Sequence, residues 1–319
     1  MSTVASRSER RPPRALAARG LRALRAIRHE PPTLLFGLVL LSLFVILAIA
    51  PGLFAPHDPN AIGGIPLSGS SSTNLLGTDE DGRDILSRVI YSARVDLPIS
   101  IAAGVLAAVG GAALGLVSGY VGGLLDTVTM RTVDIGLAFP TVVLALFLIV
   151  ILGRSEGTEI LAIALVMMPS MARFSRGAAL ALRPRAFVEA SRTSGAPVRH
   201  IVWRHILPNA LSPLLVAASV LASAAVLLSA SLSYLGLGVQ PPTPTWGGML
   251  SEAFDVVYQA PVYGVVPGIC VVLLSGAYLL IGTGLRTRQA RGPARISDAI
   301  LEHEPVLIGA PPSAAGEAR

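Results

Sequence analysis

The sequence contains no lysine, so all 25 of its basic residues are arginine. A P-loop needs a lysine on the nucleotide phosphates, and this chain cannot supply one. If the protein works with ATP, a separate polypeptide must bind it. Cysteine is almost absent as well. The single Cys270 lies within an apolar run, which excludes a disulfide framework and a thiolate metal site. We therefore predict no metal site and no cofactor bound by this chain.

Charged and aromatic residues are also scarce, at 14% and 5%, whereas hydrophobic residues make up 52% of the chain. A mean hydropathy of +0.66 is too high for an ordinary soluble domain. The net charge of +6 comes from arginines beside the ends of apolar runs, which suits anionic lipid headgroups better than nucleic acid. We predict an all-α integral membrane protein that contacts lipid and binds no nucleic acid.

Apolar runs predict the membrane helices. Each run can cross about 30 Å of hydrocarbon at about 1.5 Å per residue. The first is interpreted as a retained helix rather than a cleaved signal, because Pro51 directly follows the only tempting cleavage site, Ala48–Ala50. The stretch Ile160–Ala172 is short, and it becomes a span only if Arg173 and Arg176 lie at its cytoplasmic end. We expect six helices, near 33–54, 96–121, 131–153, 159–180, 207–230 and 262–284.

The distribution of arginine predicts the orientation. Residues 1–30 form an arginine-rich tail, and arginines also gather in the loop 183–208 and after residue 285. The positive-inside rule places these segments in the cytoplasm. Both termini are then cytoplasmic, 31–290 is the membrane domain, and 55–95 and 231–260 are external. Residues 291–319, rich in Pro, Ala and Gly, are expected to be a disordered cytoplasmic tail.

A stripe of small residues marks the second predicted helix. Small residues at every fourth position let a partner helix approach closely. An Ala/Gly-rich sequence also produces such runs by chance, and the pattern does not say whether the partner belongs to the same chain. The stripe consists of Ala103, Ala107, Gly111, Gly115 and Gly119.

The loop 183–208 has the pattern of two short helices. Pro184 can begin the first helix, and Gly195 can close it in the left-handed conformation. Pro197 suits the first turn of a second helix, which is expected to run to about Arg204 before Pro208 breaks the pattern. Two short helices joined at a glycine would form a rigid knob on the membrane domain.

Glu189 is the only acid in this loop, so it is available to pair with an arginine on a partner. Glu189-Ala190-Ser191, then Gly195 after three intervening residues, and Leu207-Pro208 resemble the EAA loop of ABC importer permeases. In that family the loop docks into a cleft on the ATPase subunit. Serine replaces the second alanine here, and His205 stands where many members have isoleucine. The resemblance implies ATPase coupling by Phe187, Glu189, Ala190, Ser191, Gly195, Ala196, His205, Leu207 and Pro208.

Further ordered segments cover most of residues 75–285 and resemble the dipeptide/oligopeptide branch of that family. Thr283 departs from the pattern, since we would expect aspartate there. The matching segments are Leu76–Asp79, Gly82–Arg88, Gly119–Gly123, Met130-Arg131 with Asp134, Phe139-Pro140, Ser231–Gly238, Pro241–Pro244, Trp246-Gly247 and Gly282–Arg286.

The resemblance implies a type I ABC importer permease fold in the bacterial plasma membrane. It implies the second, C-type permease subunit of an importer for di- and oligopeptides, with nickel chelates or glutathione as alternative substrates. The implied partners are a homologous permease subunit, two ATP-binding subunits that carry ATP and Mg, and an external substrate-binding protein. The chain itself would then be a non-catalytic subunit.

Other classes of function are less consistent with the sequence. An ion-driven secondary carrier is the alternative from a different class, but the predicted spans contain almost no ionisable residue. A membrane scaffold is a further, non-transport alternative. No Gly-x-Ser-x-Gly elbow is present, and we predict no catalytic residue.

The external segment offers possible contacts to the binding protein, namely Asp79, Arg83, Asp84, Arg88 and Trp246. An EF-hand is excluded, because Asp84 and Ile90 stand where its sixth and twelfth positions need Gly and Glu. Asp84 and Arg88 are spaced for a helical ion pair instead.

The two tryptophans and two of the histidines have simple interpretations. Trp203 and Trp246 fit interfacial anchors. His200 and His205 are five residues apart, which places them on different faces of an α-helix and argues against a shared metal ion.

Overall fold

The structure is a computed structural model that describes residues 30–302, with side chains to residue 289. Every regular element in this range is helical. The elements are α2 (Pro32–Ile49), η1 (Pro51–Leu53), α3 (Ile85–Val121), α4 (Gly123–Ala138), α5 (Thr141–Leu152), α6 (Glu156–Leu182), α7 (Ala186–Thr193), α8 (Val198–Ile201), η2 (Val202–Ile206), α9 (Leu207–Tyr234), α10 (Trp246–Asp255) and α11 (Pro261–Glu302).

Five helices are long and apolar enough to cross a membrane, and α4 with α5 forms a sixth span if the bent pair is counted as one. The prediction of one continuous helix over 131–153 is wrong, because α4 and α5 meet at an angle of 95°. Phe139 between them is extended, with φ −88° and ψ 142°. The residue before a proline avoids the α conformation, so Pro140 explains the break.

Two other boundaries differ from prediction. Helix α3 begins at Ile85 rather than near residue 96, because the side chain of Asp84 caps its first turn by accepting from Ser87 N. Helix α11 continues to Glu302, so the prediction of disorder from residue 291 is wrong for 291–302; arginine, alanine, leucine and glutamate favour helix there. The predicted tail over 1–30, apart from its last residue, and residues 303–319 lie outside the described residues.

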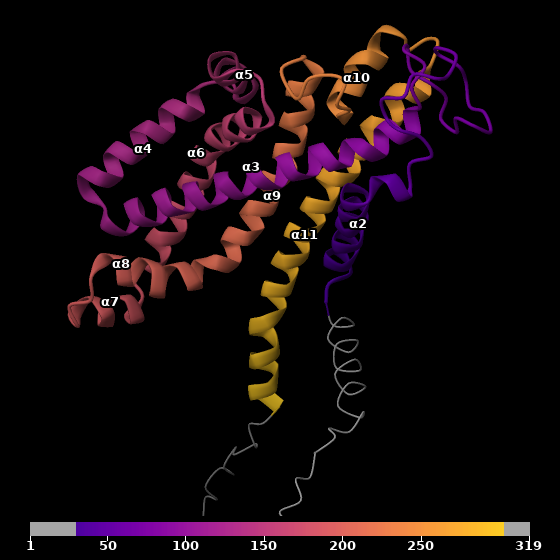
Figure 1. The fold of residues 1–319 in the computed structure, drawn as a ribbon. Coiled ribbons are helices and arrows are strands. Elements are labelled where there is room, and N and C mark those ends of the chain that lie inside the picture. Colours follow the sequence, from indigo (N-terminus) through magenta and orange to yellow (C-terminus); the bar gives the residue numbers. More distant parts are fainter. Residues whose placement is uncertain (1–29, 303–319) are drawn as a thin grey trace, which may run out of the picture.

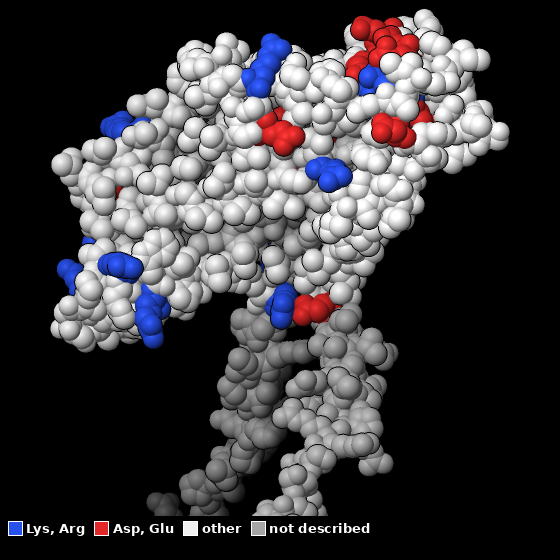
Figure 2. All heavy atoms as spheres, in the orientation of Figure 1, with Lys and Arg blue, Asp and Glu red and all other residues white. Residues whose placement is uncertain are grey.

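Helix α3 packs along α6 and α9, helix α11 packs along α9, and α2 lies against α11 (Figure 1). The start of α2, the end of α11 and the α7–α8 segment lie toward the lower side of Figure 1, whereas α10 lies at the upper side. Charged side chains are sparse over most of the surface between these sides (Figure 2). A multi-pass membrane protein fits this distribution. Which side faces the cytoplasm stays a prediction.

The stripe of small residues packs against α6 of the same chain. All five members are buried. A Cβ atom on Gly111 would lie 2.6 Å from the carbonyl oxygen of Met168, and one on Gly119 would lie 2.9 Å from that of Arg176. Ser175 Oγ donates across the interface to the Gly111 carbonyl at 3.1 Å. The backbones of α3 and α6 therefore touch along this stripe. The partner helix that the sequence left open is α6 of the same chain.

The arginines of α6 are paired with acids on α4. Arg176 donates to both carboxylate oxygens of Asp126, at 2.6 and 2.7 Å. Arg173 pairs with Asp134. Helix α6 continues past both arginines to Leu182, so they do not mark its end. Pairing explains how a charge is tolerated within a span.

Candidate functional site

The knob, residues 183–208, consists of two short helices that meet at a glycine. Gly195 has φ +76°, which confirms the predicted left-handed residue between α7 and α8. The turn is closed by backbone bonds from Gly195 N to the Arg192 carbonyl at 3.0 Å and from Ala196 N to the Ser191 carbonyl at 3.1 Å. Side chains other than glycine adopt this conformation at a cost, so Gly195 fixes the angle between the helices.

The inner side of the knob is apolar and anchors it to the membrane helices. Val188, Ile201, Val202 and Ile206 are each at most 1% exposed, and they pack in one cluster with Leu116 of α3. Ala179 of α6 belongs to the same cluster. Sequence reasoning missed this anchor, although the apolar positions among arginines carried the signal. The knob is thus seated on two spans rather than tethered by a flexible loop.

The outer side of the knob holds most of the predicted coupling residues, whereas Ala196 and Leu207 pack against the inner cluster. None of them is buried, so the arrangement leaves them available to a partner, and their role stays a prediction. Phe187 is 38% exposed, and Glu189 lines a recess of about 180 Å³ with Arg183 and Arg192. Phe187, Glu189, Ala190, Gly195 and Pro208 are exposed, and Ser191, Ala196, His205 and Leu207 are partly buried.

Pro208 does not break the second helix, contrary to prediction. It lies in the first turn of α9, and η2 before it is π-helical, so residues 198–234 form one continuous helical stretch. Proline lacks the N–H that would bond the carbonyl four residues earlier, and the wider π-turn accommodates this loss. The π-turn also brings His200 and His205 together, with ring centroids 5.4 Å apart. The expectation that they occupy different faces is therefore wrong.

A second polar site lies on the opposite side of the molecule, in the cap formed by residues 55–84 and α10. Asp79 is 1% exposed and accepts from Arg83 N at 2.8 Å and Arg83 Nε at 2.7 Å. Burial alone would lower the pKa of the Arg83 guanidinium. Its bond to Asp79, with the neighbouring carboxylates of Glu252 and Asp81, raises that pKa above its ordinary value. Arg83 therefore stays charged and holds the segment closed.

Arg88 links this segment to α10. Its Nη2 atom donates to both oxygens of Glu252, at 3.2 and 3.1 Å, and its Nε atom lies 3.4 Å from Asp79 Oδ2. Tyr263 of α11 donates to the same Glu252 carboxylate. The predicted ion pair between Asp84 and Arg88 does not form, because Asp84 Oδ2 accepts from Ser87 N and Ser87 Oγ instead. Asp84 therefore caps the start of α3 and does not pair with Arg88.

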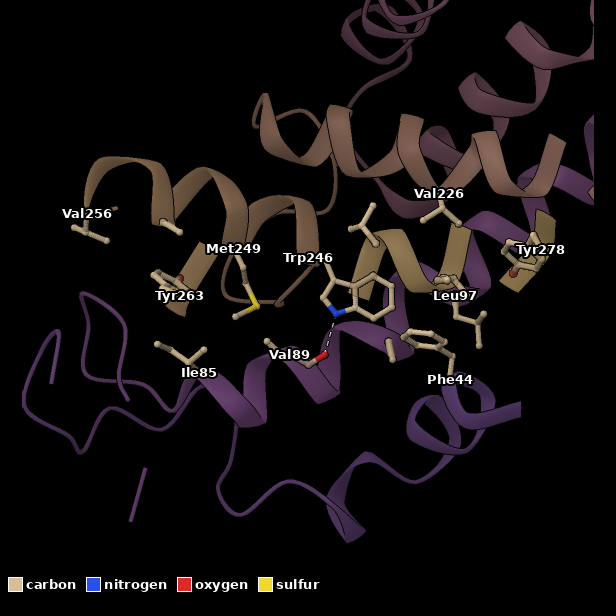
Figure 3. Packing of buried hydrophobic residues seen from close by; sticks show 14 residues of the cluster. Phe44, Ile85, Val89, Leu97, Val226, Trp246, Met249, Val256, Tyr263 and Tyr278 are labelled. Atoms are coloured by element: carbon tan, nitrogen blue, oxygen red, sulfur yellow. Dashed lines mark hydrogen bonds between the residues drawn. The ribbon is translucent and has the colours of Figure 1, made fainter. Parts of the chain in front are cut away.

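Trp246 closes the cap from inside (Figure 3). Its indole Nε1 donates to the Val89 carbonyl at 3.0 Å, and its ring meets Phe44 edge-on at a centroid distance of 5.5 Å. Its backbone N–H donates to Asp96 Oδ2 at 2.8 Å. At 1% exposure, Trp246 is a core residue, so its assignment as an interfacial anchor is wrong. Trp203, at 44% exposure, remains able to serve as one.

The burial of the cap residues also corrects their predicted role. Asp79, Asp84, Arg88 and Trp246 are each at most 3% exposed, and the Arg83 side chain is 12% exposed. Groups this buried cannot offer a face to an external protein. They fix the shape of the cap, and any contact with a partner falls to residues around them. Glu252, 164 positions away from Arg88, was missed because nothing local indicates it.

Two further buried carboxylates were also missed. Glu159 on α6 is 1% exposed and accepts from Ser229 Oγ of α9 at 2.5 Å. Asp96 on α3 is 5% exposed. Both tie neighbouring spans to one another or to α10. Within residues 30–302, no group of three or more His, Cys, Asp or Glu side chains is arranged to hold a metal ion.

The sequence matches known protein families and curated proteins. A family model described as "binding-protein-dependent transport system inner membrane component" matches residues 111–291, a range that includes the knob and most of the spans.

Curated relatives match over a longer range. The dipeptide transport system permease protein of Alkalihalophilus pseudofirmus is 38% identical over 251 residues, which cover 78% of this chain and 83% of that protein. The glutathione transport system permease protein of Pectobacterium atrosepticum is 38% identical over 251 residues, 77% of this chain and 83% of that protein. The probable D,D-dipeptide transport system permease protein of Escherichia coli is 35% identical over 277 residues, 86% of this chain and 93% of that protein.

Proposed function

We propose that this chain, which belongs to the family of binding-protein-dependent transport system inner membrane components, is a permease subunit of an ATP-driven importer of di- and oligopeptides. It would act with a homologous permease subunit, two ATP-binding subunits and an external substrate-binding protein. The knob and both termini would face the cytoplasm, as the arginine distribution indicates. ATP and Mg would bind to the partner ATPase, since this chain has no lysine for a P-loop.

The observation that carries the proposal is the two-sided construction of the knob. Its outer side exposes Phe187 and Glu189, while its inner side buries Val188 against α3 and α6. When the ATPase subunits close on ATP, a force on the outer side would pass through this apolar anchor to the spans. Rigid movement of packed helices is a standard route to alternating access.

The coupling role can be tested with Glu189→Arg and Gly195→Val in the assembled transporter. The first reverses the charge at an exposed position, and the second forces a β-branched residue into φ +76°, a conformation that costs about 1–2 kcal/mol. We expect peptide uptake and peptide-stimulated ATP hydrolysis to fall at least about tenfold, equivalent to about 1.4 kcal/mol of coupling, with the chain still in the membrane.

Gly177→Ala serves as the matched control, because a Cβ atom there meets nothing within 4 Å. Wild-type uptake by both knob variants would rule out the coupling role.

Glutathione is the second candidate substrate, because relatives named for dipeptide and glutathione transport match this chain at the same 38% identity. A binding assay on the partner binding protein against dipeptides, oligopeptides, glutathione and nickel chelates would separate these substrates. Peptide binding without glutathione binding supports the proposal, and the reverse result would replace the substrate.

A further inference from the structure

The helical stretch 198–206 has a second surface, which shares only Pro208 with the predicted coupling residues. Ile201, Val202 and Ile206 face the core, whereas Trp203 and its neighbours face outward. The outward residues line a recess of about 740 Å³, whose walls are Pro197, Arg199, His200, Trp203, Arg204 and Pro208. This recess is distinct from the one that contains Glu189.

The π-helical turn contributes to the construction of this recess. A π-turn is rare and occurs most often at functional sites. Here it allows the His200 and His205 rings to meet edge-to-face with an interplanar angle of 64°. Trp203, in the same turn, remains 44% exposed despite its size. The turn therefore presents an aromatic and basic surface while its opposite side stays packed in the core.

The recess carries uncompensated positive charge. Arg199 and Arg204 line it with no acidic neighbour, and neither takes part in an ion pair among the described residues. The only acid of the knob, Glu189, lies in the other recess. Two guanidinium groups beside an imidazole form a donor set that suits the oxygens of a phosphate group.

The position of the recess indicates the source of that phosphate. Pro208, one of its walls, lies in the first turn of α9, and α9 belongs to a membrane span. The recess therefore lies at the arginine-bearing end of this span, where tryptophan side chains and anionic headgroups are found when such a helix crosses a bilayer. We propose that the recess binds the phosphate headgroup of an anionic membrane lipid. This contact does not depend on how the knob couples to an ATPase.

Trp203 supplies a direct probe. The chain has two tryptophans, and Trp246 is buried at 1% exposure, so brominated lipids should quench mainly Trp203. The full chain is placed in phosphatidylcholine vesicles that contain equal fractions of brominated phosphatidylglycerol or brominated phosphatidylcholine. We expect the anionic lipid to quench about twofold more strongly, because the arginines beside Trp203 attract its headgroup. Trp203→Phe gives the background signal.

The double variant Arg199→Gln/Arg204→Gln should abolish the preference for the anionic lipid. Its matched control, Arg183→Gln/Arg192→Gln, removes the same charge from the other recess and should keep the preference. Equal quenching by both lipids in the wild-type protein, or a preference that survives the first double variant, would overturn the proposal. A preference that inorganic phosphate abolishes, but chloride at the same ionic strength does not, would also overturn it, because the ligand would then be soluble phosphate.

Discussion

The cap and the knob handle charge in opposite ways. In the cap, Asp79 and Arg88 are at most 2% exposed, and Arg88 forms ion pairs with both Asp79 and Glu252. In the knob, Glu189 and Arg192 are exposed, and the buried side chains are apolar. The same residue types therefore act as internal ties at one side of the molecule and as free surface at the other.

This difference shows why charge in a sequence does not by itself identify a binding surface. A buried ion pair is costly to break, because removing one partner leaves the other charge without compensation. An exposed charge contributes little to folding and stays available to a partner. The cap is consequently the part with a fixed shape, and the knob is the part whose surface chemistry is open to recognition.

The largest effect on stability is expected where α3 and α6 pack between the cap and the knob, because this contact must be rigid to hold the two regions in place. Gly115→Val would place a side chain 2.8 Å or closer to Arg176 N, and backbone atoms of α6 cannot move aside. We expect a loss of about 3 kcal/mol or more, seen as failure to recover folded protein in detergent. Gly177→Ala on α6, which meets open space, should be neutral or slightly stabilising. Normal folding of Gly115→Val would disprove the close contact of α3 with α6.

The next effect compares one substitution at the two ends. Arg88→Met keeps apolar bulk but leaves Glu252 and Asp79 without a buried partner, and should lower the free energy of unfolding by about 3 kcal/mol. Arg192→Met in the knob should change it by less than about 0.5 kcal/mol. Denaturant unfolding can be followed by Trp246 fluorescence in a Trp203→Phe background. Equal losses at both sites would remove the distinction between cap and knob.

A smaller effect separates the two sides of the knob itself. Val188→Ser removes an apolar side chain that is 1% exposed, and should lower the free energy of unfolding by about 2 kcal/mol. Phe187→Ser, at 38% exposure, should leave stability nearly unchanged. If Phe187 docks on the ATPase, its loss should weaken copurification of that subunit. A stability loss from Phe187→Ser as large as that from Val188→Ser would contradict the assignment of inner and outer sides.

The smallest effect concerns the serine that departs from the family pattern. Ser191 Oγ donates to the Phe187 carbonyl of its own helix at 2.9 Å, so it is not directed at a partner. Ser191→Ala should change the free energy of unfolding by less than about 0.5 kcal/mol and leave peptide-stimulated ATP hydrolysis within about twofold of wild type. A tenfold loss would show that the hydroxyl takes part in docking.

Much of the fold was predictable because a long charge-free apolar run is stable in few settings besides a membrane helix. The first span and α6 lie close to their predicted positions. The break at Phe139 and Pro140 was missed because proline also occurs inside membrane helices, as Pro169 does in α6. Helix α10 was missed because its two glycines and two acids suit an external loop as well as a short helix.

The candidate sites were predictable only where the signal is local. Gly195 was recognised because a left-handed residue between two helices is usually glycine, which can be read directly from the sequence. The partner of Arg88 on α10 could not be found in this way. Only tertiary packing brings Glu252 of α10, with Tyr263 of α11 bonded to it, to Arg88 of α3. The meeting of His200 and His205 was also missed, since it depends on a π-turn rather than on residue spacing in an α-helix.

The continuous stretch 198–234 has a mechanical consequence. It joins the knob to the far side of the molecule, where Ser229 reaches Glu159 and Ala230 packs near Gly247 of α10. No loop interrupts the stretch 198–234, so a tilt of its end at the knob is transmitted to its end near α10. The π-turn holds one extra residue relative to an α-helical turn. The five residues of η2 therefore set how α9 is rotated about its own axis relative to the knob.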